Sequence, residues 1–578
     1  MQSQIVNKKI LFLFFALFFA TGVYAQQPAQ VKIIEVVHAD IMDVKRKMPD
    51  LTRLLGDVRL RHEDMTMTCD SAYFFKKENR LDAFSRVHIT NDGGSVTIDG
   101  NFAKYDGNTK LAEIWGNVVL VDSNAVMKTQ HLYYNRITNI AYYLVGAEII
   151  NKENNMVSKY GHYHRNTNMF YAKKDVVLVT KDYNIVGDTL NYNVKTKVAD
   201  FVGPTYIQNE KDTIYCERGW YDTNDTIAFF RQNAWIKSGS TTVNADTLFY
   251  ESKTGNGRGF SNIVIVDTTN NVILKGHKGW FNNTTENAWL TRKALLIMAS
   301  KQDSLFLHAD TLRSIADTAG FKIMKAYNRV RFFSRDMQGK CDSLVLSLKD
   351  TVIHMFRLPV LWAQDNQMTA EHIEIETENQ KPRRINMINK GFIVQEDLAG
   401  FNQIKSKKII GLFRDNELYR VEGYNDSETV YYLYDGTDLT GVNKMKSANL
   451  VILIENKQAQ EIKYYNGIDG GLIPINEFDQ DELTLLGFKW HIELKPVDKD
   501  DIYEWKEEAA SSAKADAPVA SDAPGKTGNT KTSPASTKAK EKPANTRNTP
   551  ATNDTRERPA ITRERPANSP TGIRPSRN

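Results

Sequence analysis

The stretch VNADTLFY, residues 243–250, alternates like a β-strand but changes face in its middle. Val243 and Ala245 lie on one side of an extended chain, whereas Leu248 and Tyr250 lie on the other, because strand side chains alternate with a period of two. All four can face one interior only if an extra residue is inserted between Ala245 and Leu248. The stretch therefore predicts a strand that bends at a bulge or corner and continues into a second sheet.

This eight-residue pattern, which we call the corner motif, returns through most of the chain. Further copies are MTCDSAYF (67–74), IDGNFAKY (98–105), MKTQHLYY (127–134), MVSKYGHY (156–163), IVGDTLNY (185–192), IYCERGWY (214–221), LKGHKGWF (274–281), LHADTLRS (307–314), GKCDSLVL (339–346), MTAEHIEI (368–375) and the looser IKSKKIIG (404–411) and MKSANLVI (445–452). From residue 74 to residue 281 the closing positions are 29 or 31 residues apart. Such a period indicates one repeat protein and not a row of unrelated domains.

A second strand precedes many of the corner motifs. It carries two apolar residues separated by one residue, 14 to 16 residues before the closing position. The pairs are Val58/Leu60, Val118/Leu120, Val176/Leu178, Ala234/Ile236, Val330/Phe332 and, one residue closer, Val360/Trp362. Period-two alternation, β-branched and aromatic content, and turn residues between the two strands favour strand–turn–strand units.

The sequence therefore predicts an all-β fold. We expect an elongated β-jelly-roll, in which repeats of about 30 residues stack and two facing sheets share one interior. Cys69, Cys216 and Cys341 all occupy the small third position of the corner motif, where other copies have Gly or Ala. We expect them to be packed core residues and not partners in disulfide bonds.

Composition divides the chain into five parts. They are a signal peptide (1–25), a lead-in strand region (26–50), regular repeats (51–395), divergent C-terminal repeats (396–505) and a tail (506–578). The signal peptide is indicated by Lys8 and Lys9 before the apolar run ILFLFFALFFA, with small residues at the end of TGVYA. An uncleaved anchor is the alternative, but the apolar run is about half the length of a spanning helix.

The two C-terminal parts differ in character. The stretch DQDELTLLGF (479–488) is typical of a short helix that Asp479 or Asp481 could cap. From Ala509 on, the tail has no aromatic residue and holds six Lys and seven Arg against three Asp and three Glu, so we expect it to be disordered. It is a solvated linker or a segment that touches an anionic envelope surface. Without the tail the chain is mildly acidic and lacks the basic patch of a nucleic-acid-binding protein.

Few polar residues are arranged for chemistry. The fourth position of the corner motif often holds an acid, at Asp70, Asp188, Asp246, Asp310 and Asp342. These acids could form a calcium ladder, but Lys159 and Lys407 occupy the same position in other copies, so we favour hydrogen bonds to nearby backbone N–H groups. His162 and His164 share a strand face without an evident third metal ligand. No nucleophile or phosphate-loop motif is present, and we expect no enzyme activity, metal or cofactor.

The interior is the strongest candidate site. If the two sheets separate, its apolar side chains form a groove that shelters acyl chains, and if they do not, the same side chains are an ordinary core. The candidates for the groove are Val58, Leu60, Val118, Leu120, Val176, Leu178, Val243, Leu248 and Tyr250.

Several stretches carry a family resemblance. LLGDVRLRHEDMTMTCDSAYFF, IWGNVVLVDSNAVMKTQHLYY and KDVVLVTKDYNIVGDTLNY resemble the OstA-like (organic solvent tolerance) domain of the LptA and LptD N-terminal family, in a long form that extends over roughly Val31 to Tyr503. The resemblance implies a β-jelly-roll in the periplasm that binds the acyl chains of lipopolysaccharide and pairs edge to edge with other Lpt-type jelly-rolls at the inner and outer membranes. It implies no catalysis. This chain has about twice the repeats of a short LptA-type protein.

We therefore expect a lipid carrier or bridge for lipopolysaccharide transport and outer-membrane assembly. Two other functions remain open. A structural or adhesive β-solenoid would have a filled core, and a polysaccharide-acting solenoid enzyme would need a group of acidic or basic residues on one exposed strip.

Overall fold

The computed structural model describes residues 32–507 except 153, 300–302, 318, 379–380 and 475–481. The described residues lie in one compact unit, Met1–Ala509. The expected signal peptide and nearly all of the expected disordered tail lie outside the described residues. No helix in the described part of the chain has the length and apolar character needed to cross a membrane.

The prediction of an all-β fold is confirmed, because the described residues form 36 strands and four short 3-10 turns. The strands of the first half are β1 (Glu35–His38), β2 (Ile41–Val44), β3 (Leu51–His62), β4 (Met65–Phe75), β5 (Arg80–Asn91), β6 (Val96–Asp106), β7 (Leu111–Asp122), β8 (Val126–Asn135), β9 (Ile140–Tyr143), β10 (Ala147–Ile150), β11 (Asn155–Ser158), β12 (Tyr160–His164), β13 (Met169–Val179), β14 (Asn184–Asn193), β15 (Val198–Phe201), β16 (Thr205–Gln208), β17 (Asp212–Cys216), β18 (Arg218–Asp222), β19 (Ile227–Ser238) and β20 (Thr241–Glu251).

The strands of the second half are β21 (Asn256–Asp267), β22 (Val272–Asn282), β23 (Asn287–Ala299), β24 (Ser304–Ala316), β25 (Lys322–Phe333), β26 (Met337–Ser347), β27 (Val352–Phe356), β28 (Val360–Ala363), β29 (Asn366–Thr369), β30 (His372–Glu378), β31 (Lys381–Asp397), β32 (Gly400–Arg414), β33 (Glu417–Asp435), β34 (Asp438–Glu455), β35 (Gln458–Tyr465) and β36 (Asp469–Pro474). The 3-10 turns are η1 (Asp92–Gly94), η2 (Arg165–Thr167), η4 (Ile492–Leu494) and η5 (Asp501–Tyr503).

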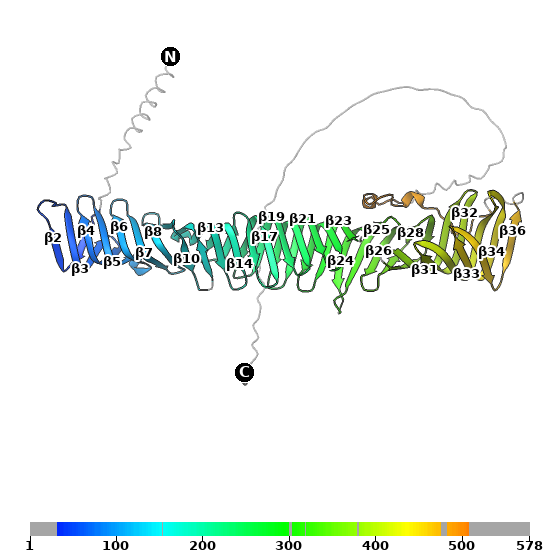
Figure 1. The fold of residues 1–578 in the computed structure, drawn as a ribbon, viewed down its shortest axis with the longest axis horizontal. Coiled ribbons are helices and arrows are strands. Elements are labelled where there is room, and N and C mark those ends of the chain that lie inside the picture. The colour runs from blue at the N-terminus through cyan, green and yellow to red at the C-terminus, as the bar shows by residue number, and fades with distance from the viewer. Residues whose placement is uncertain are drawn as a thin grey trace, which may run out of the picture. The chain divides into compact units, whose positions relative to one another are not determined.

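Neighbouring strands pair antiparallel in chain order, so this unit is elongated (Figure 1). The strands form one continuous antiparallel sheet, and each full-length strand bends at a register shift near its middle, so that its two halves form two facing layers that we treat as two sheets. We call the sheet that contains residues 241–245 of β20 the first sheet, and the sheet that contains residues 247–251 the second sheet. The sheets meet at the corner of each strand, and the hairpin turns of both sheets line the opposite side, which we call the mouth.

The predicted change of face is confirmed at the corner. In β20, Val243, Ala245, Leu248 and Tyr250 are all buried, and the strand register shifts between Asn244 and Thr247. The looser copies obey the same rule, since Ile404, Ser406, Ile409 and Gly411 are buried in β32. The corner motif thus keeps its apolar side chains directed at the interior in both sheets.

A second feature of the corner escaped the sequence analysis. The strand that precedes eleven of the thirteen motifs, all but 156–163 and 214–221, holds two consecutive residues with positive φ, and a twelfth pair, Asn466/Gly467, follows the last motif. In β19 these residues, Gln232 and Asn233, oppose the single residue Asp246 of β20. The pair adds an even number of residues to the strand, so the alternation of faces is preserved, and Phe230 and Ala234 on either side of it both face the interior. The pairs are Gly56/Asp57, Ser85/Arg86, Gly116/Asn117, Lys174/Asp175, Gln232/Asn233, Ser261/Asn262, Arg292/Lys293, Asn328/Arg329, Arg357/Leu358, Asn389/Lys390, Asn425/Asp426 and Asn466/Gly467.

The segment 482–507 does not continue the repeats. It runs back along the outer face of the first sheet, from β34 and β32 toward β25, and we call it the C-terminal strap (Figure 1). The helix expected at 479–488 is not formed in its described part, because residues 482–488 lie in turns. The backbone polar groups there bond to Gln403 of the sheet, through Leu483 O and Leu485 N, and not within a helix.

The strap also corrects one apolar pair. We expected Val360 and Trp362 to face the interior, but Leu361 and Ala363 belong to the interior cluster, whereas Val360 and Trp362 pack against Leu494 of the strap. Both faces of β28 are buried, so apolar character alone could not assign the inward face.

The positive-φ pairs predict opposite effects of glycine at two neighbouring exposed lysines. Glycine at Lys174 (φ 65) should stabilise β13 by about 1 kcal/mol, because a residue with a Cβ is strained in this region. Glycine at Lys173, which lies in the paired strand, should destabilise it by about 0.5–1 kcal/mol. Hydrogen exchange of β13 and β14 in the two variants measures both effects, and changes of the same sign would contradict the assigned corner.

Candidate functional site

The nine predicted groove residues all face the interior. Val58, Leu60, Val118, Leu120, Val176, Leu178, Val243, Leu248 and Tyr250 are only 0–3 % exposed. They belong to one continuous cluster of buried apolar side chains that extends from Ile34 to Ile452. The interior is therefore shared from end to end, as expected, and side chains of both sheets fill it. Contact of these residues with lipid stays a prediction.

Tyrosines hold the mouth closed in the first half of the unit. Five tyrosines that close corner motifs lie at the mouth edge of the second sheet, and their hydroxyl groups reach polar side chains of the first sheet; the buried hydroxyl of Tyr221, which closes motif 214–221, makes no such contact among the described residues. We call these contacts the tyrosine clasps. They are Tyr105 with His62 Nδ1 (2.6 Å), Tyr134 with Asn91 Nδ2 (3.5 Å), Tyr163 with Asp122 Oδ2 (3.1 Å), Tyr192 with Asn154 Nδ2 (2.6 Å) and Tyr250 with Asp212 Oδ2 (3.1 Å).

Burial governs the chemistry of the clasps. It raises the pKa of Tyr105 to about 12 and also raises the pKa values of Tyr163 and Tyr250, with the Asp122 and Asp212 carboxylates adding to the shift for the latter two. The phenols therefore stay protonated and donate to the two carboxylates. A sequence signal for the clasps existed, because the closing aromatic is Tyr in these copies, but it does not identify the partner across the mouth.

Arginines reinforce the clasps. The Arg136 side chain, 4 % exposed, lies at the mouth and bonds to Asp64 (Nη2–Oδ1, 2.5 Å), the Tyr105 hydroxyl (2.8 Å) and Asn91 (3.0 Å). Arg165 bonds to Asp122 (Nε–Oδ2, 3.1 Å) in the same way. The mouth thus has a polar rim over an apolar interior.

The clasps end after Tyr250, and a cavity follows. The next closing residues are Phe281, Ser314 and Leu346, which lack a phenol hydroxyl. Here a cavity of about 130 Å³ enters between the sheets, and we call it the port. Its apolar lining includes Val243, Ile265, Leu274, Phe281 and Met324.

A lysine spans the mouth at the port. The Lys322 side chain, 6 % exposed, lies 2.9 Å from Glu286 Oε2 and 3.4 Å from Asp267 Oδ2 of the first sheet. Burial opposes ionisation of Asp267, but hydrogen bonds from Asn270 and the charge of Lys322 outweigh it and lower its pKa. An ion pair thus replaces the tyrosine clasp at this point.

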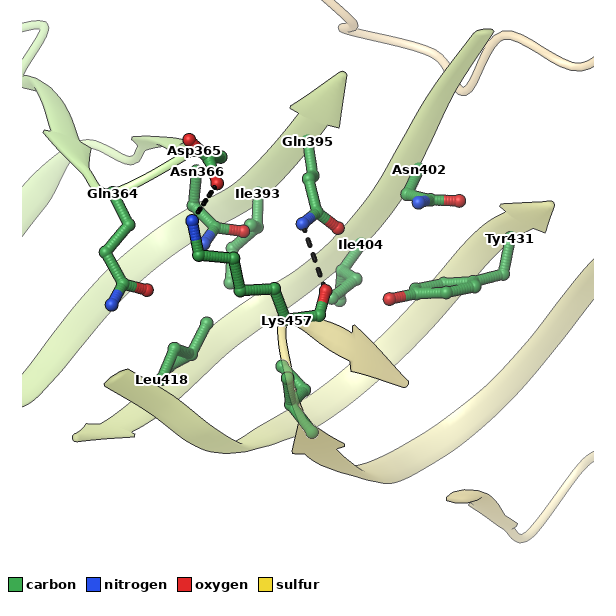
Figure 2. A pocket seen from close by; sticks show the side chains of 11 residues that line it. Gln364, Asp365, Asn366, Ile393, Gln395, Asn402, Ile404, Leu418, Tyr431 and Lys457 are labelled. Carbon is green, nitrogen blue, oxygen red and sulfur yellow. Dashed lines mark hydrogen bonds and ion pairs between the residues drawn. The ribbon is translucent and has the colours of Figure 1, made fainter. Parts of the chain in front are cut away.

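Two more hollows lie along the mouth. A polar recess of about 1240 Å³, lined in part by Lys181, Asp182, Asn209 and Asp212, adjoins the port. Toward the C-terminal end, Figure 2 shows a hollow of about 20 Å³, where Lys457 pairs with Asp365 (Nζ–Oδ2, 2.8 Å). Lysine–carboxylate pairs therefore occur at the mouth both at the port and near the C-terminal end of the unit.

The acidic residues of the corner motif bond to side chains, not to backbone as we expected. Asp70 pairs with Arg86 (Nη2–Oδ1, 2.6 Å), Asp310 with Arg329 (2.6 Å) and Asp246 with Asn262 (2.8 Å), and each partner is the second residue of a positive-φ pair. Asp342 pairs with Arg357 (3.4 Å), and Asp188 accepts from Thr189 (3.0 Å). The Arg86 guanidinium lowers the pKa of Asp70. These acids fasten corners and already have cationic or polar partners.

The remaining candidates occupy structural positions. Cys69, Cys216 and Cys341 are free and buried at the corner, and burial raises the pKa of Cys69 to about 11 and of Cys216 to about 12. His162 and His164 lie side by side, with ring centroids 4.9 Å apart; His162 stacks against Tyr171, and the ring of His164 contacts the same tyrosine at a tilt. In the described part of the chain they belong to no group of three metal-ligating side chains.

The clasps predict a local loss of stability when one hydroxyl is removed. Tyr163→Phe removes one of the donors to the Asp122 carboxylate, which is 3 % exposed and keeps Arg165 and Ser123, and should lower the local free energy of opening by about 0.5–1.5 kcal/mol. Tyr171→Phe on the outer face is the control and should change it by less than about 0.5 kcal/mol. Hydrogen exchange of β7 and β12 measures the difference, and equal exchange in both variants would contradict a stabilising role of this clasp.

Part of the chain matches the model of a known protein family. The model of the OstA-like protein family matches residues 31–188 and 192–305. Among solved structures, the chain is similar to the crystal structure of LptH, the LptA-homologous periplasmic component of the lipopolysaccharide transport device of Pseudomonas aeruginosa, at 10% identity and a TM-score of 0.14, covering 25% of this chain and 82% of that chain. The search of curated proteins gave no match. Residues 31–188 and 192–305, which hold the most regular of the repeats, are thus similar to the OstA-like protein family.

Proposed function

We propose that this protein carries lipopolysaccharide across the periplasm, with the acyl chains of lipid A held between the two sheets. The observation that supports this function most is the continuous apolar interior beneath a polar mouth. An amphiphile with several acyl chains and a polar headgroup matches this arrangement, because the chains would leave water while the headgroup stayed at the rim. The similarity of residues 31–188 and 192–305 to the OstA-like family supports the same proposal.

Loading requires the sheets to part at the mouth. Interior side chains that exchange contacts with each other for contacts with acyl chains remain out of water, so little apolar burial is lost. The main cost is the opening of mouth contacts, each worth about 0.5–1.5 kcal/mol net. Burial of acyl chains contributes about 0.8 kcal/mol for each CH₂ group, so a single chain of ordinary length offsets several clasps. The port, where the Lys322–Asp267 ion pair replaces the clasp, is the proposed place of entry.

The ends of the unit provide the proposed contacts to other jelly-rolls. At the N-terminal end, Val37, Ile41, Met42 and Val44 of β1 and β2 are more than half exposed. In the described residues, β1 and β2 each pair with β3 alone, and β35 and β36 pair with β34 alone. Such edges add a strand from a partner readily. We assign the partners to Lpt-type proteins of the inner and outer membranes, reached after export by the signal peptide.

A filled interior also suits a second function, a structural or adhesive envelope protein without lipid cargo. Depletion of the protein in cells distinguishes the two. Loss of a carrier leaves lipopolysaccharide at the inner membrane, which membrane fractionation detects, whereas loss of an adhesin reduces attachment and leaves lipopolysaccharide distribution unchanged.

Photo-crosslinking tests the carrier directly. A photoreactive amino acid at Leu120 or Leu178 should capture lipopolysaccharide in living cells, because both side chains face the interior. The matched controls are Val121 and Val179, which neighbour them on the same strands and are 38% and 44% exposed. Labelling at Leu120 and Leu178 that is no stronger than at these controls would contradict the proposed groove.

A further inference from the structure

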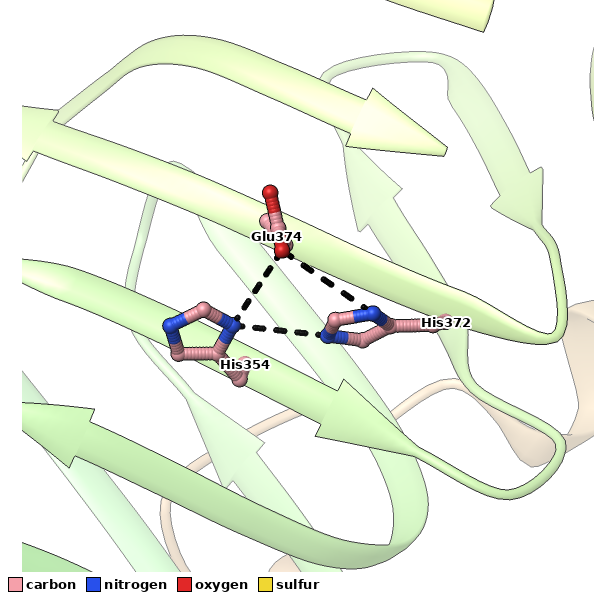
Figure 3. Close-up of side chains that lie close together, drawn as sticks. All are labelled: His354, His372 and Glu374. Carbon is pink, nitrogen blue, oxygen red and sulfur yellow. Dashed lines mark hydrogen bonds and ion pairs between the residues drawn. The ribbon is translucent and has the colours of Figure 1, made fainter. Parts of the chain in front are cut away.

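Three side chains with metal-binding atoms meet on the outer face of the second sheet. His354 of β27 lies opposite Glu374 of β30 in the antiparallel ladder, and His372 is two residues before Glu374 on the same face. Figure 3 shows the two imidazole rings and the carboxylate directed toward one point. His354 Nδ1 lies 3.4 Å from His372 Nε2 and 3.6 Å from Glu374 Oε1, and His372 Nδ1 lies 3.9 Å from the same oxygen.

These distances match the spacing of ligands around one small metal ion. Zinc binds imidazole nitrogen and carboxylate oxygen at about 2.0–2.2 Å in a tetrahedron, which places neighbouring ligand atoms about 3.4 Å apart. One ligand atom from each of the three residues lies within 4.8 Å of the others, so only small side-chain rotations are needed. The side chains of His354, His372 and Glu374 are 33%, 24% and 29% exposed, which leaves a fourth position accessible to water.

Neighbouring side chains fix the orientation of the three ligands. The ring of Phe356 stacks against His372 (centroids 4.6 Å apart, planes at 13°) and against His354 (6.1 Å, 13°). Asn386 of β31 donates to the other carboxylate oxygen, Glu374 Oε2 (3.5 Å), and Arg384 donates to Asn386 (3.0 Å). Supporting contacts of this kind, behind the ligands, are typical of protein metal sites.

We propose that His354, His372 and Glu374 bind a divalent transition-metal ion of the zinc class, with water or an incoming ligand in the fourth position. Two imidazoles and one carboxylate suit Zn²⁺ and its neighbours in the first transition row, whereas Ca²⁺ and Mg²⁺ take oxygen ligands. The site lies beyond residue 305, outside the part of the chain that matches the OstA-like family. It joins two short strands, β27 and β30, beside the positive-φ pair Arg357/Leu358.

The proposal is independent of lipid transport. The ligands lie on the outer face, while Ile353, Met355, Ile373 and Ile375 of the same strands face the interior. The metal would hold β27 against β30 and should raise the melting temperature, since a ligand that binds only the folded state stabilises it.

Zinc titration of the untagged, exported full-length chain tests the site. After chelation and dialysis, calorimetry with ZnCl₂ should give one high-affinity equivalent that is lost in His354→Asn, His372→Asn and Glu374→Gln. The double variant His162→Asn/His164→Asn is the matched control, because it removes two neighbouring histidines of the outer face and should keep the equivalent. Absence of binding to the unaltered chain, or equal binding in the Glu374→Gln variant, would overturn the proposal.

Cobalt provides a second readout that does not depend on the stability of the histidine variants. Co²⁺ in a four-coordinate site with nitrogen and oxygen ligands absorbs visible light strongly, and octahedral Co²⁺ in water absorbs weakly. The unaltered chain and the His162/His164 control should develop the strong bands with one equivalent of Co²⁺, and Zn²⁺ should displace them. Bands of the same intensity in Glu374→Gln would also contradict the site.

Discussion

Most repeats of this protein depend on a mismatch in residue number at the corner. The strand before the motif uses two residues with positive φ where the motif strand uses one, as Gln232 and Asn233 do opposite Asp246. This mismatch bends both strands together and keeps the apolar face of each directed inward. Non-glycine residues are strained by about 1–2 kcal/mol in this region, and contacts such as Asp70–Arg86 and Asp246–Asn262 form at the same corners. The continuous apolar interior forms because this corner recurs along the chain.

The mouth is the part of the structure that can change. Corners are continuous with the backbone ladder, whereas in the described residues the two sheets are joined at the mouth by side-chain contacts such as Tyr163 with Asp122 and Lys322 with Asp267. Mouth contacts can open without breaking strand pairing. The change from tyrosine clasps to a lysine bridge after Tyr250 divides the mouth into a clasped part and a part with a port. A carrier that opens from the mouth would therefore begin to open at the port.

Sequence periodicity predicted the all-β class, the repeat and the change of face, because a side chain's face follows from its position along a strand. It also placed all nine groove candidates inside. It did not predict features that depend on distant residues. The partner of Tyr250 is 38 residues away, the strap bonds Gln367 to Lys489 across 122 residues, and His354 meets His372 through an antiparallel pairing. Val360 and Trp362 were assigned to the wrong face for the same reason, since the strap that buries them comes from far along the chain.

The distance across the port, with and without lipopolysaccharide, tests the central claim most directly. Nitroxide labels at Ser240 in the first sheet and Thr285 in the second sheet lie in exposed turns beside the port, and replacement of the three buried cysteines by alanine matches the residue at the same corner position in other copies. Pulsed electron paramagnetic resonance should show a longer Ser240–Thr285 distance when lipopolysaccharide is bound, while two labels on either side of a corner keep their distance. A port distance that stays the same in the lipid-bound protein would contradict a carrier that opens at its mouth.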